Sequence, residues 1–141
     1  MAEFVLDTSV AMSWCFEDEA NSYADTVLDS LIDITALAPS IWPLGVGNVL
    51  LLARWRKRIS QSDSMRFLEL LNSLPIEVEI LSEQRMFEAV LNLARKQKLS
   101  SYDATYLDLA MQTGFKLATL DQSLRKAAGR CGVAIFQEEK I

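Results

Sequence analysis

Apolar residues along the chain follow two different patterns. In some stretches they form short continuous runs bounded by proline, aspartate or glycine, which is typical of buried strands. In the longer stretches between these runs they recur every three or four positions, as on one face of an amphipathic helix. The short runs predict strands at Phe4–Leu6, Ile34–Ala38, Val78–Leu81, Lys116–Leu120 and Val133–Phe136.

Helical patterns fill the segments between these strands. Glu83–Lys98 is the longest, and Met86, Phe87, Val90, Leu91 and Ala94 form its expected buried stripe. Capping residues, proline and glycine mark the ends of the helices. The other predicted helices cover about Val10–Phe16, Ala20–Leu31, Asp63–Leu74 and Ser101–Thr113, with a glycine-bearing helix after Pro43 and a short helix after Asp121.

Alternation of strands and helices predicts an α/β fold with a parallel sheet, because each return to the same edge of a sheet needs a crossover. The 141 residues suit a single domain spanning 1–141, and half of them are hydrophobic. Ligands bind such folds outside the carboxyl ends of the strands. Residues that follow the predicted strands are therefore the candidates for a functional site.

The chain contains no histidine and has a net charge of −5. Chemistry based on a Ser-His or Cys-His pair is excluded, as is a zinc site built from imidazoles. Cys15 and Cys131 lack the spacing of a metal site, and Cys15 between Trp14 and Phe16 is typical of a buried thiol. No apolar run approaches the length that crosses a bilayer, and the N-terminus does not resemble a signal peptide, so we expect a cytoplasmic protein.

Three aspartates occupy the positions where a site is expected. Asp7 ends the first predicted strand, Asp121 ends the strand Lys116–Leu120, and Asp103 lies in the first turn of a helix. Each has a structural explanation, since Asp7 and Asp121 can cap helices and Ser100 with Asp103 matches a capping box. Together they indicate convergent carboxylates, which a hard divalent cation such as Mg²⁺ or Mn²⁺ would neutralise.

The segment "LGVGNVLL" at 44–51 resembles a phosphate-binding loop at first sight. It lacks the third glycine of the dinucleotide fingerprint, and Pro39 and Pro43 precede it where a central strand would be required. Pro43 instead predicts the first turn of a helix that contains Gly45 and Gly47. Each glycine is expected to destabilise that helix by about 1 kcal/mol relative to alanine.

Four segments together resemble the PIN domain family, and more narrowly the VapC-type ribonuclease toxins of bacterial toxin-antitoxin pairs. These segments are "FVLDTSV", "PSIWPLGVGNVLLLA", "LSSYDATYLDLAMQTGFKLATLD" and "SLRKAA", which span essentially the whole chain in order. The resemblance implies a three-layer α/β/α sandwich around a parallel sheet. It also implies metal-dependent cleavage of RNA with Mg²⁺ or Mn²⁺ as cofactor.

The resemblance assigns roles to individual residues. Asp7, Asp103 and Asp121 match acidic positions of the family and are the expected metal ligands and catalytic residues, and Asn48 matches a polar position near the site. The remaining acidic position is usually a glutamate three residues before that asparagine, and Gly45 stands there instead. We therefore expect weakened activity. Hydrogen-bonding support is expected from Thr8, Ser9 and Thr119.

The resemblance also implies partners: an RNA substrate, a VapB-like antitoxin that covers the acidic cleft, and a second copy in a homodimer. A catalytically inactive binding module that keeps the fold and its partner remains an alternative. A phosphoacceptor regulatory domain is a weaker alternative, because it needs an acidic pair where Thr8 and Ser9 stand. A haloacid-type phosphatase needs the pattern D-x-D, and Ser9 occupies the second acidic position.

Basic residues cluster in three blocks. They can serve as last-turn cations of helices or as contacts for an RNA backbone, and the sequence leaves both readings open. Trp42 and Trp55 are compatible either with an interface or with core packing. The blocks are Arg54–Arg58, Arg95–Lys98, and Arg125 with Lys126 and Arg130.

Overall fold

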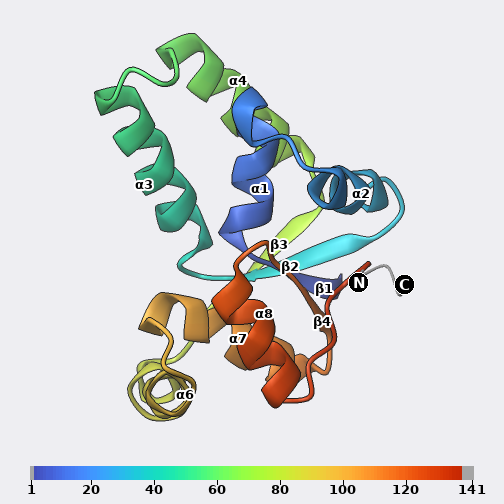
Figure 1. The fold of residues 1–141 in the computed structure, drawn as a ribbon, viewed down its shortest axis with the longest axis vertical. Coiled ribbons are helices and arrows are strands. Elements are labelled where there is room, and N and C mark those ends of the chain that lie inside the picture. Colours follow the sequence, from blue (N-terminus) through green and yellow to red (C-terminus); the bar gives the residue numbers. More distant parts are fainter. Residues whose placement is uncertain (1, 138–141) are drawn as a thin grey trace.

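A parallel four-stranded sheet forms the centre of the protein (Figure 1). The computed structural model describes residues 2–137. The strands lie in the order β3-β2-β1-β4, so β1 is flanked on both sides and β3 and β4 are the edges. The strands are β1 (Ala2–Leu6), β2 (Thr35–Pro39), β3 (Ile76–Glu79) and β4 (Lys116–Ala118).

Helices cover both faces of the sheet, which confirms the predicted α/β/α sandwich. In Figure 1 the helices α1 to α4 lie above the sheet, and α6, α7 and α8 lie below it. The α-helices are α1 (Thr8–Cys15), α2 (Ser22–Ser30), α3 (Trp42–Trp55), α4 (Gln61–Ser73), α5 (Glu83–Arg85), α6 (Leu91–Gln97), α7 (Ser101–Thr113) and α8 (Gln122–Arg130), and the shorter turns are η1 (Glu17–Glu19) and η2 (Met86–Val90).

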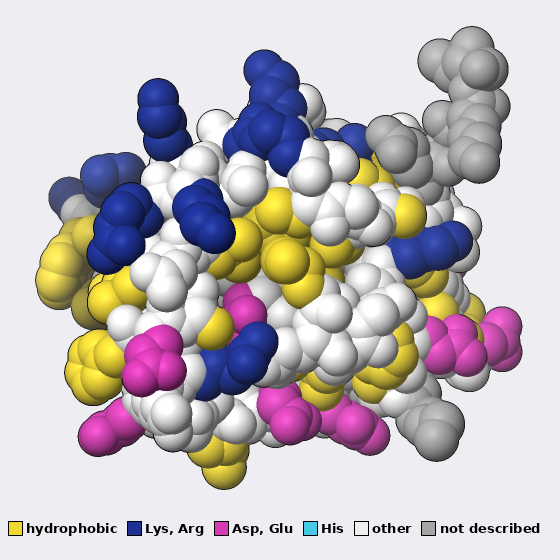
Figure 2. All heavy atoms as spheres, turned by 90° about the horizontal axis from the view of Figure 1, so that it is seen from below, with side chains coloured by type: hydrophobic (Ala, Val, Ile, Leu, Met, Phe, Trp, Pro, Cys, Tyr) yellow, Lys and Arg dark blue, Asp and Glu magenta, His cyan; other side chains and the backbone are white. Residues whose placement is uncertain are grey.

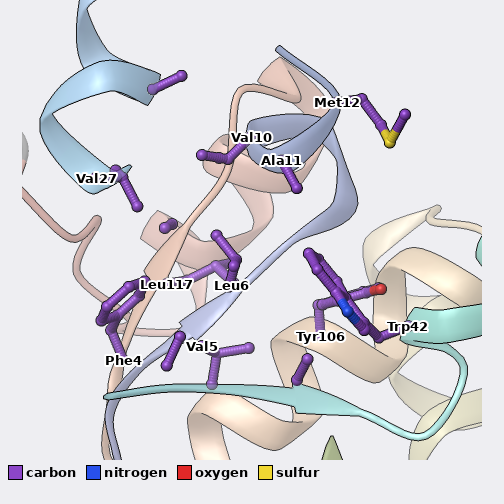
Figure 3. Packing of buried hydrophobic residues seen from close by; sticks show 14 of the residues in the cluster. Phe4, Val5, Leu6, Val10, Ala11, Met12, Val27, Trp42, Tyr106 and Leu117 are labelled. Carbon is purple, nitrogen blue, oxygen red and sulfur yellow. The ribbon is translucent and has the colours of Figure 1, made fainter. Parts of the chain in front are cut away.

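The core is built around β1, whose last residues are completely buried (Figure 3). Phe4 stacks on Phe136 with ring centroids 3.9 Å apart. From α7, the run Ala104–Ala110 is buried throughout, so this helix lies between the sheet and its outer neighbours. Such burial on all sides explains why α7 lacks the polar face of a surface helix. It also fixes the position of Asp103 at the start of α7.

Two predicted strands differ most from the observed ones, and the predicted strand Lys116–Leu120 ends early, at Ala118. The third strand begins at Ile76, directly after Pro75, and ends at Glu79. The last predicted strand, Val133–Phe136, forms a single parallel bridge between Ile135 and Leu117. Because β4 offers only three residues, it can support little further pairing at this edge.

The segment Glu83–Gln97 contains a π-helical turn, η2, which the sequence pattern did not predict. A π turn places an extra residue in the helix and rotates the following side chains away from a 3.6-residue period. The predicted stripe is therefore only partly correct. Val90 and Ala94 are buried, whereas Met86, Phe87 and Leu91 are exposed.

Within residues 2–137, no helix combines the length and the apolar character needed to cross a membrane.

Candidate functional site

The predicted site residues come from neighbouring strands. β1 pairs in parallel with β4, so the residues that follow the two strands lie at the same edge of the sheet. Asp7 follows β1, and Thr119 and Asp121 follow β4. The backbone of Asp7 is tied to β4 by a hydrogen bond of 3.0 Å from its amide to the carbonyl of Ala118. The sheet therefore fixes the separation of the two acidic segments.

Asp7 occupies the N-cap position of α1, but its side chain does not cap the helix. Its Oδ2 instead accepts hydrogen bonds from Ser9 Oγ at 2.7 Å and from Thr119 Oγ1 at 2.8 Å. Ser9 Oγ also accepts a hydrogen bond of 2.9 Å from the amide of Leu120. The capping explanation is therefore wrong for Asp7. A 5% exposed carboxylate is held in place by two hydroxyl groups.

The other two aspartates lie at the starts of helices. Asp121 does cap α8, because its Oδ1 accepts a hydrogen bond of 3.0 Å from the amide of Leu124. At α7 the cap is Ser100, which accepts from the amide of Asp103 at 3.1 Å. Capping thus accounts for one oxygen of Asp121 and for Ser100, and it leaves the placement of the Asp103 carboxylate to be explained.

All three aspartates line one cavity of about 540 Å³. Its walls come from the end of β1, the beginning of α3, the beginning of α7 and the segment after β4. Among the expected site residues, only Thr119 lies outside the lining, and it acts through Asp7. The lining consists of Asp7, Thr8, Ser9, Ile41, Leu44, Gly45, Asn48, Val49, Tyr102, Asp103, Tyr106 and Asp121.

Burial and the charges of neighbouring carboxylates make Asp7 and Asp103 resist ionisation. Burial raises the pKa of Asp7, the hydrogen bonds from Ser9 and Thr119 oppose that effect, and the charge of Asp121 adds to it. Burial, together with the charges of Asp7 and Asp121, raises the pKa of Asp103 to about 6, and a hydrogen bond with Ser100 opposes this rise. The three groups therefore interact electrostatically across the cavity.

The donor chemistry of the cavity fits a hard divalent cation, but the donor set is incomplete. Carboxylate oxygens with added waters are the ligands that Mg²⁺ prefers, and no Lys or Arg of residues 2–137 lines the cavity to neutralise the aspartates. In the same part of the chain, however, no group of three or more His, Cys, Asp or Glu side chains lies close enough together to hold a metal ion. Asp7, Asp103 and Asp121 therefore line the same cavity, but their side chains are not close enough together to coordinate one ion in this conformation.

Gly45 lines the cavity at the position where the family resemblance expects a further acidic side chain. A Cβ atom placed on Gly45 would lie 3.5 Å from Thr8 Oγ1, which is an ordinary contact distance. A side chain at this position would therefore start beside Thr8, on the wall of the cavity. Asn48 lines the same cavity one turn further along α3. Position 45 thus has room for the Cβ atom of a side chain on the wall of the cavity.

Two tyrosines, Tyr102 and Tyr106, also line the cavity, and the sequence patterns did not single them out. Tyr106 Oη and Thr8 Oγ1 share a hydrogen bond of 2.9 Å, and burial raises the pKa of the tyrosine. Tyr102 lies at the rim and is 68% exposed. The sequence could have indicated both tyrosines by their spacing from Asp103. Tyr102 directly precedes Asp103, and Tyr106 follows it by three residues, a spacing at which residues share a helix face.

The basic blocks lie outside the cavity lining. Arg58 pairs with Asp18 and Glu19, and Arg130 donates to Gln97. Arg125 donates to the carbonyl of Thr119 at 2.7 Å and lies over the ring of Tyr23. On the face formed by α6, α7 and α8, Lys and Arg gather mostly along one border and Asp and Glu along the opposite one (Figure 2). The net negative charge is therefore unevenly distributed.

A second cavity of about 730 Å³ contains none of the expected site residues. It lies between α1 and α4, and its walls include Cys15, Arg58 and Phe67. Burial, together with the charges of Asp63 and Glu19, raises the pKa of the Cys15 thiol to about 11. A thiol that stays protonated at neutral pH is a poor nucleophile, as expected for a structural cysteine. The carboxylates make the first cavity the better candidate.

Comparisons with known proteins agree with this geometry. The chain is similar to PAE2754 from Pyrobaculum aerophilum, whose crystal structure superimposes with a TM-score of 0.68 at 21% sequence identity, covering 89% of this chain and 79% of the other. At that identity the likeness supports the fold alone. No curated protein matches the chain. The family model described as PIN domain matches residues 4–130, a range that contains every residue of the aspartate cavity. The chain therefore belongs to the PIN domain family.

Proposed function

We propose that this protein is a metal-dependent endoribonuclease of the VapC toxin type whose activity is weakened by Gly45. PIN domains are generally metal-dependent nucleases. The observation that carries the proposal is the convergence of Asp7, Asp103 and Asp121 on one cavity that also contains position 45. Helix capping accounts for only one of these three carboxylates.

The chain's own residues supply the framework for this chemistry. Ser9 and Thr119 orient the Asp7 carboxylate, and the cap on α8 orients that of Asp121. Asp103 has a pKa of about 6, so it can carry a proton or release one near neutral pH. A bound divalent ion, Mg²⁺ or Mn²⁺, would lower the pKa of a coordinated water and neutralise charge on the attacked phosphate.

Gly45 is the proposed cause of the weakening. Without an acidic side chain on α3, water must fill the position that a carboxylate would occupy. The attraction between a cation and a carboxylate in contact is several kcal/mol at an effective dielectric near 20, and water recovers only a part of it. We therefore expect weak metal binding in a chain that still folds.

The proposed partners follow from the VapC resemblance. They are RNA, a VapB-like antitoxin whose segment covers the acidic cavity, and a second copy of the chain. Basic side chains outside the cavity offer contacts for the phosphate backbone (Figure 2). Exposed apolar side chains on α3, among them Leu51 and Trp55, are compatible with a protein interface.

The test compares the chain with Gly45→Glu in an RNA cleavage assay with Mn²⁺. Because the Cβ at position 45 has room beside Thr8, the variant should fold and should cleave RNA at least 10-fold faster, which corresponds to about 1.4 kcal/mol. Gly45→Gln is the matched control, since it adds equal bulk without the charge. Equal rates for all three proteins, under excess metal, would contradict the proposal.

A second candidate function is a non-catalytic PIN-fold module that binds a protein or RNA partner. The absence of a group of three metal-binding side chains within residues 2–137 favours it. This candidate predicts no cleavage by Gly45→Glu at any metal concentration, although partner binding would be retained.

A further inference from the structure

The cavity changes in character from its buried end to its rim. Asp7 at the buried end is 5% exposed, whereas Leu44 and Tyr102 at the rim are 75% and 68% exposed. Leu44 belongs to α3 and Tyr102 to α7, so two different helices supply the apolar surfaces of the rim. The cavity thus offers carboxylates in its interior and an aliphatic and an aromatic surface at its opening.

Tyr102 differs from Tyr106 although both lie on the same side of α7, one turn apart. Tyr106 is 3% exposed, belongs to the core and hydrogen-bonds Thr8. Within residues 2–137, no side chain hydrogen-bonds the hydroxyl of Tyr102. Its ring therefore contributes little to the stability of the fold. An exposed aromatic ring directly beside Asp103 is available for a ligand.

The composition of the cavity limits what that ligand can be. No Lys or Arg from the described part of the chain lines the walls, so the rim attracts an uncharged group more readily than a phosphate. Aromatic side chains bind single-stranded RNA by stacking on its bases, which are planar and uncharged. A strand whose phosphate lies at the aspartate end of the cavity would carry the attached base towards the rim.

We propose that Tyr102, together with Leu44 of α3, is a positioning residue that stacks on a base of single-stranded RNA next to the phosphate at the aspartates. This inference rests on the proposed function for the class of substrate. It assigns a separate role to a residue outside the metal-binding and catalytic set. The stacked base would fix how far the strand enters the cavity.

The test uses a short single-stranded oligoribonucleotide with 2-aminopurine, whose fluorescence is quenched by stacking, and Ca²⁺ in place of Mn²⁺. We expect the chain to bind and quench the probe. Tyr102→Ala should bind about 10-fold more weakly and lose the quenching, because base–aromatic stacking accounts for a change of that order. Tyr102→Phe retains the ring and should match the parent.

Phe87→Ala is the matched control, because Phe87 is 69% exposed and lies outside the cavity. It should bind and quench like the parent, and circular dichroism should show that all variants are folded. The inference is overturned if the chain does not bind the probe, if Tyr102→Ala behaves like the parent, or if Phe87→Ala loses as much. Unchanged binding by Tyr102→Ala is also the result expected if a protein covers this rim.

The inference and the proposed function can fail separately. Cleavage of RNA by Gly45→Glu that does not depend on Tyr102 would leave the nuclease and remove the stacking role. Quenching that depends on Tyr102 without any cleavage would leave the stacking role and remove the nuclease.

Discussion

Asp7 stands at the N-cap position of α1, yet its carboxylate accepts hydrogen bonds from Ser9 and Thr119 rather than from the helix. The sequence alone could not decide between these arrangements, because both use an aspartate at the end of a strand. The decision depends on Thr119, which follows a strand more than a hundred residues away. Long-range pairing of β1 with β4 brings the two together.

Asp103 gives a pH dependence that can be measured. Its pKa is raised from an ordinary value of 3.8 to about 6, so between these values the folded chain binds more protons than the unfolded chain. Stability from this group is therefore present below about pH 4 and is lost as the pH rises through about 6. In Asp103→Asn this loss should disappear.

Urea denaturation in the presence of a chelator measures this effect. The variant should gain stability relative to the parent between pH 4 and pH 7, with a plateau above. A stability difference that stays constant across this range would show that the Asp103 carboxylate is not perturbed by burial and by its neighbours.

At the scale of single elements, α3 is a helix that carries two glycines in different surroundings. Gly45 faces the cavity beside Thr8, whereas a Cβ on Gly47 would meet nothing within 4 Å. Pro43 correctly predicted the first turn of this helix. The helix itself was predictable from the sequence, but its pattern alone could not decide which glycine lines the cavity, because that depends on packing against α1. Only the family resemblance singled out Gly45.

Gly47→Ala should stabilise the protein. Alanine loses less backbone entropy than glycine on entering a helix, and the exposed site leaves room for the methyl group, so we expect a gain of about 0.5–1 kcal/mol. Thermal denaturation of the variant and the parent measures this gain. A lower melting temperature would indicate that Gly47 has a conformational role that the helix does not show.

The helical segment from Glu83 to Gln97 shows the limit of periodicity as a guide. Met86 and Phe87 at the start of its π turn are exposed rather than buried, and the sequence carried no signal for that turn. An ion pair holds this segment against α7. Arg85 Nε and Nη2 donate to the two carboxylate oxygens of Asp108 at 2.9 and 2.8 Å.

Removing one partner of this pair should destabilise the protein. Arg85→Met leaves the 7% exposed side chain of Asp108 charged and without its partner, which should lower the free energy of unfolding by about 3 kcal/mol. Adding Asp108→Leu should recover much of that loss. Urea denaturation of both single variants and the double variant gives the coupling, and additive effects would contradict a direct interaction.

At the scale of the whole molecule, the order of strands and helices was readable from the sequence because strand and helix patterns alternate cleanly. The parallel sheet and the placement of Asp7 and Asp121 at one edge of it followed from that order. The helices on both faces and the place of Asp103 beside the other aspartates were implied by the family resemblance. The edges were less predictable. Ile135 makes only one bridge, because a strand's length depends on its neighbour β4 rather than on its own residues.

The uneven distribution of charge is also a property of the whole molecule. A net charge of −5 argues weakly against an RNA-binding protein. The folded chain nevertheless gathers Lys and Arg mostly along one border of the α6–α8 face, and carboxylates lie in the cavity (Figure 2). Charge counted along a sequence cannot show this separation, which arises only when distant segments are brought together.

Asp7, Asp103 and Asp121 are proposed to bind a divalent ion together, with an affinity that Gly45 limits. Calorimetric titration with Mn²⁺ of the parent, Asp7→Asn and Gly45→Glu tests this proposal most directly. We predict one weak saturable site in the parent, its loss in Asp7→Asn, and binding at least 10-fold tighter in Gly45→Glu, equivalent to about 1.4 kcal/mol. The same affinity in all three proteins would contradict the account.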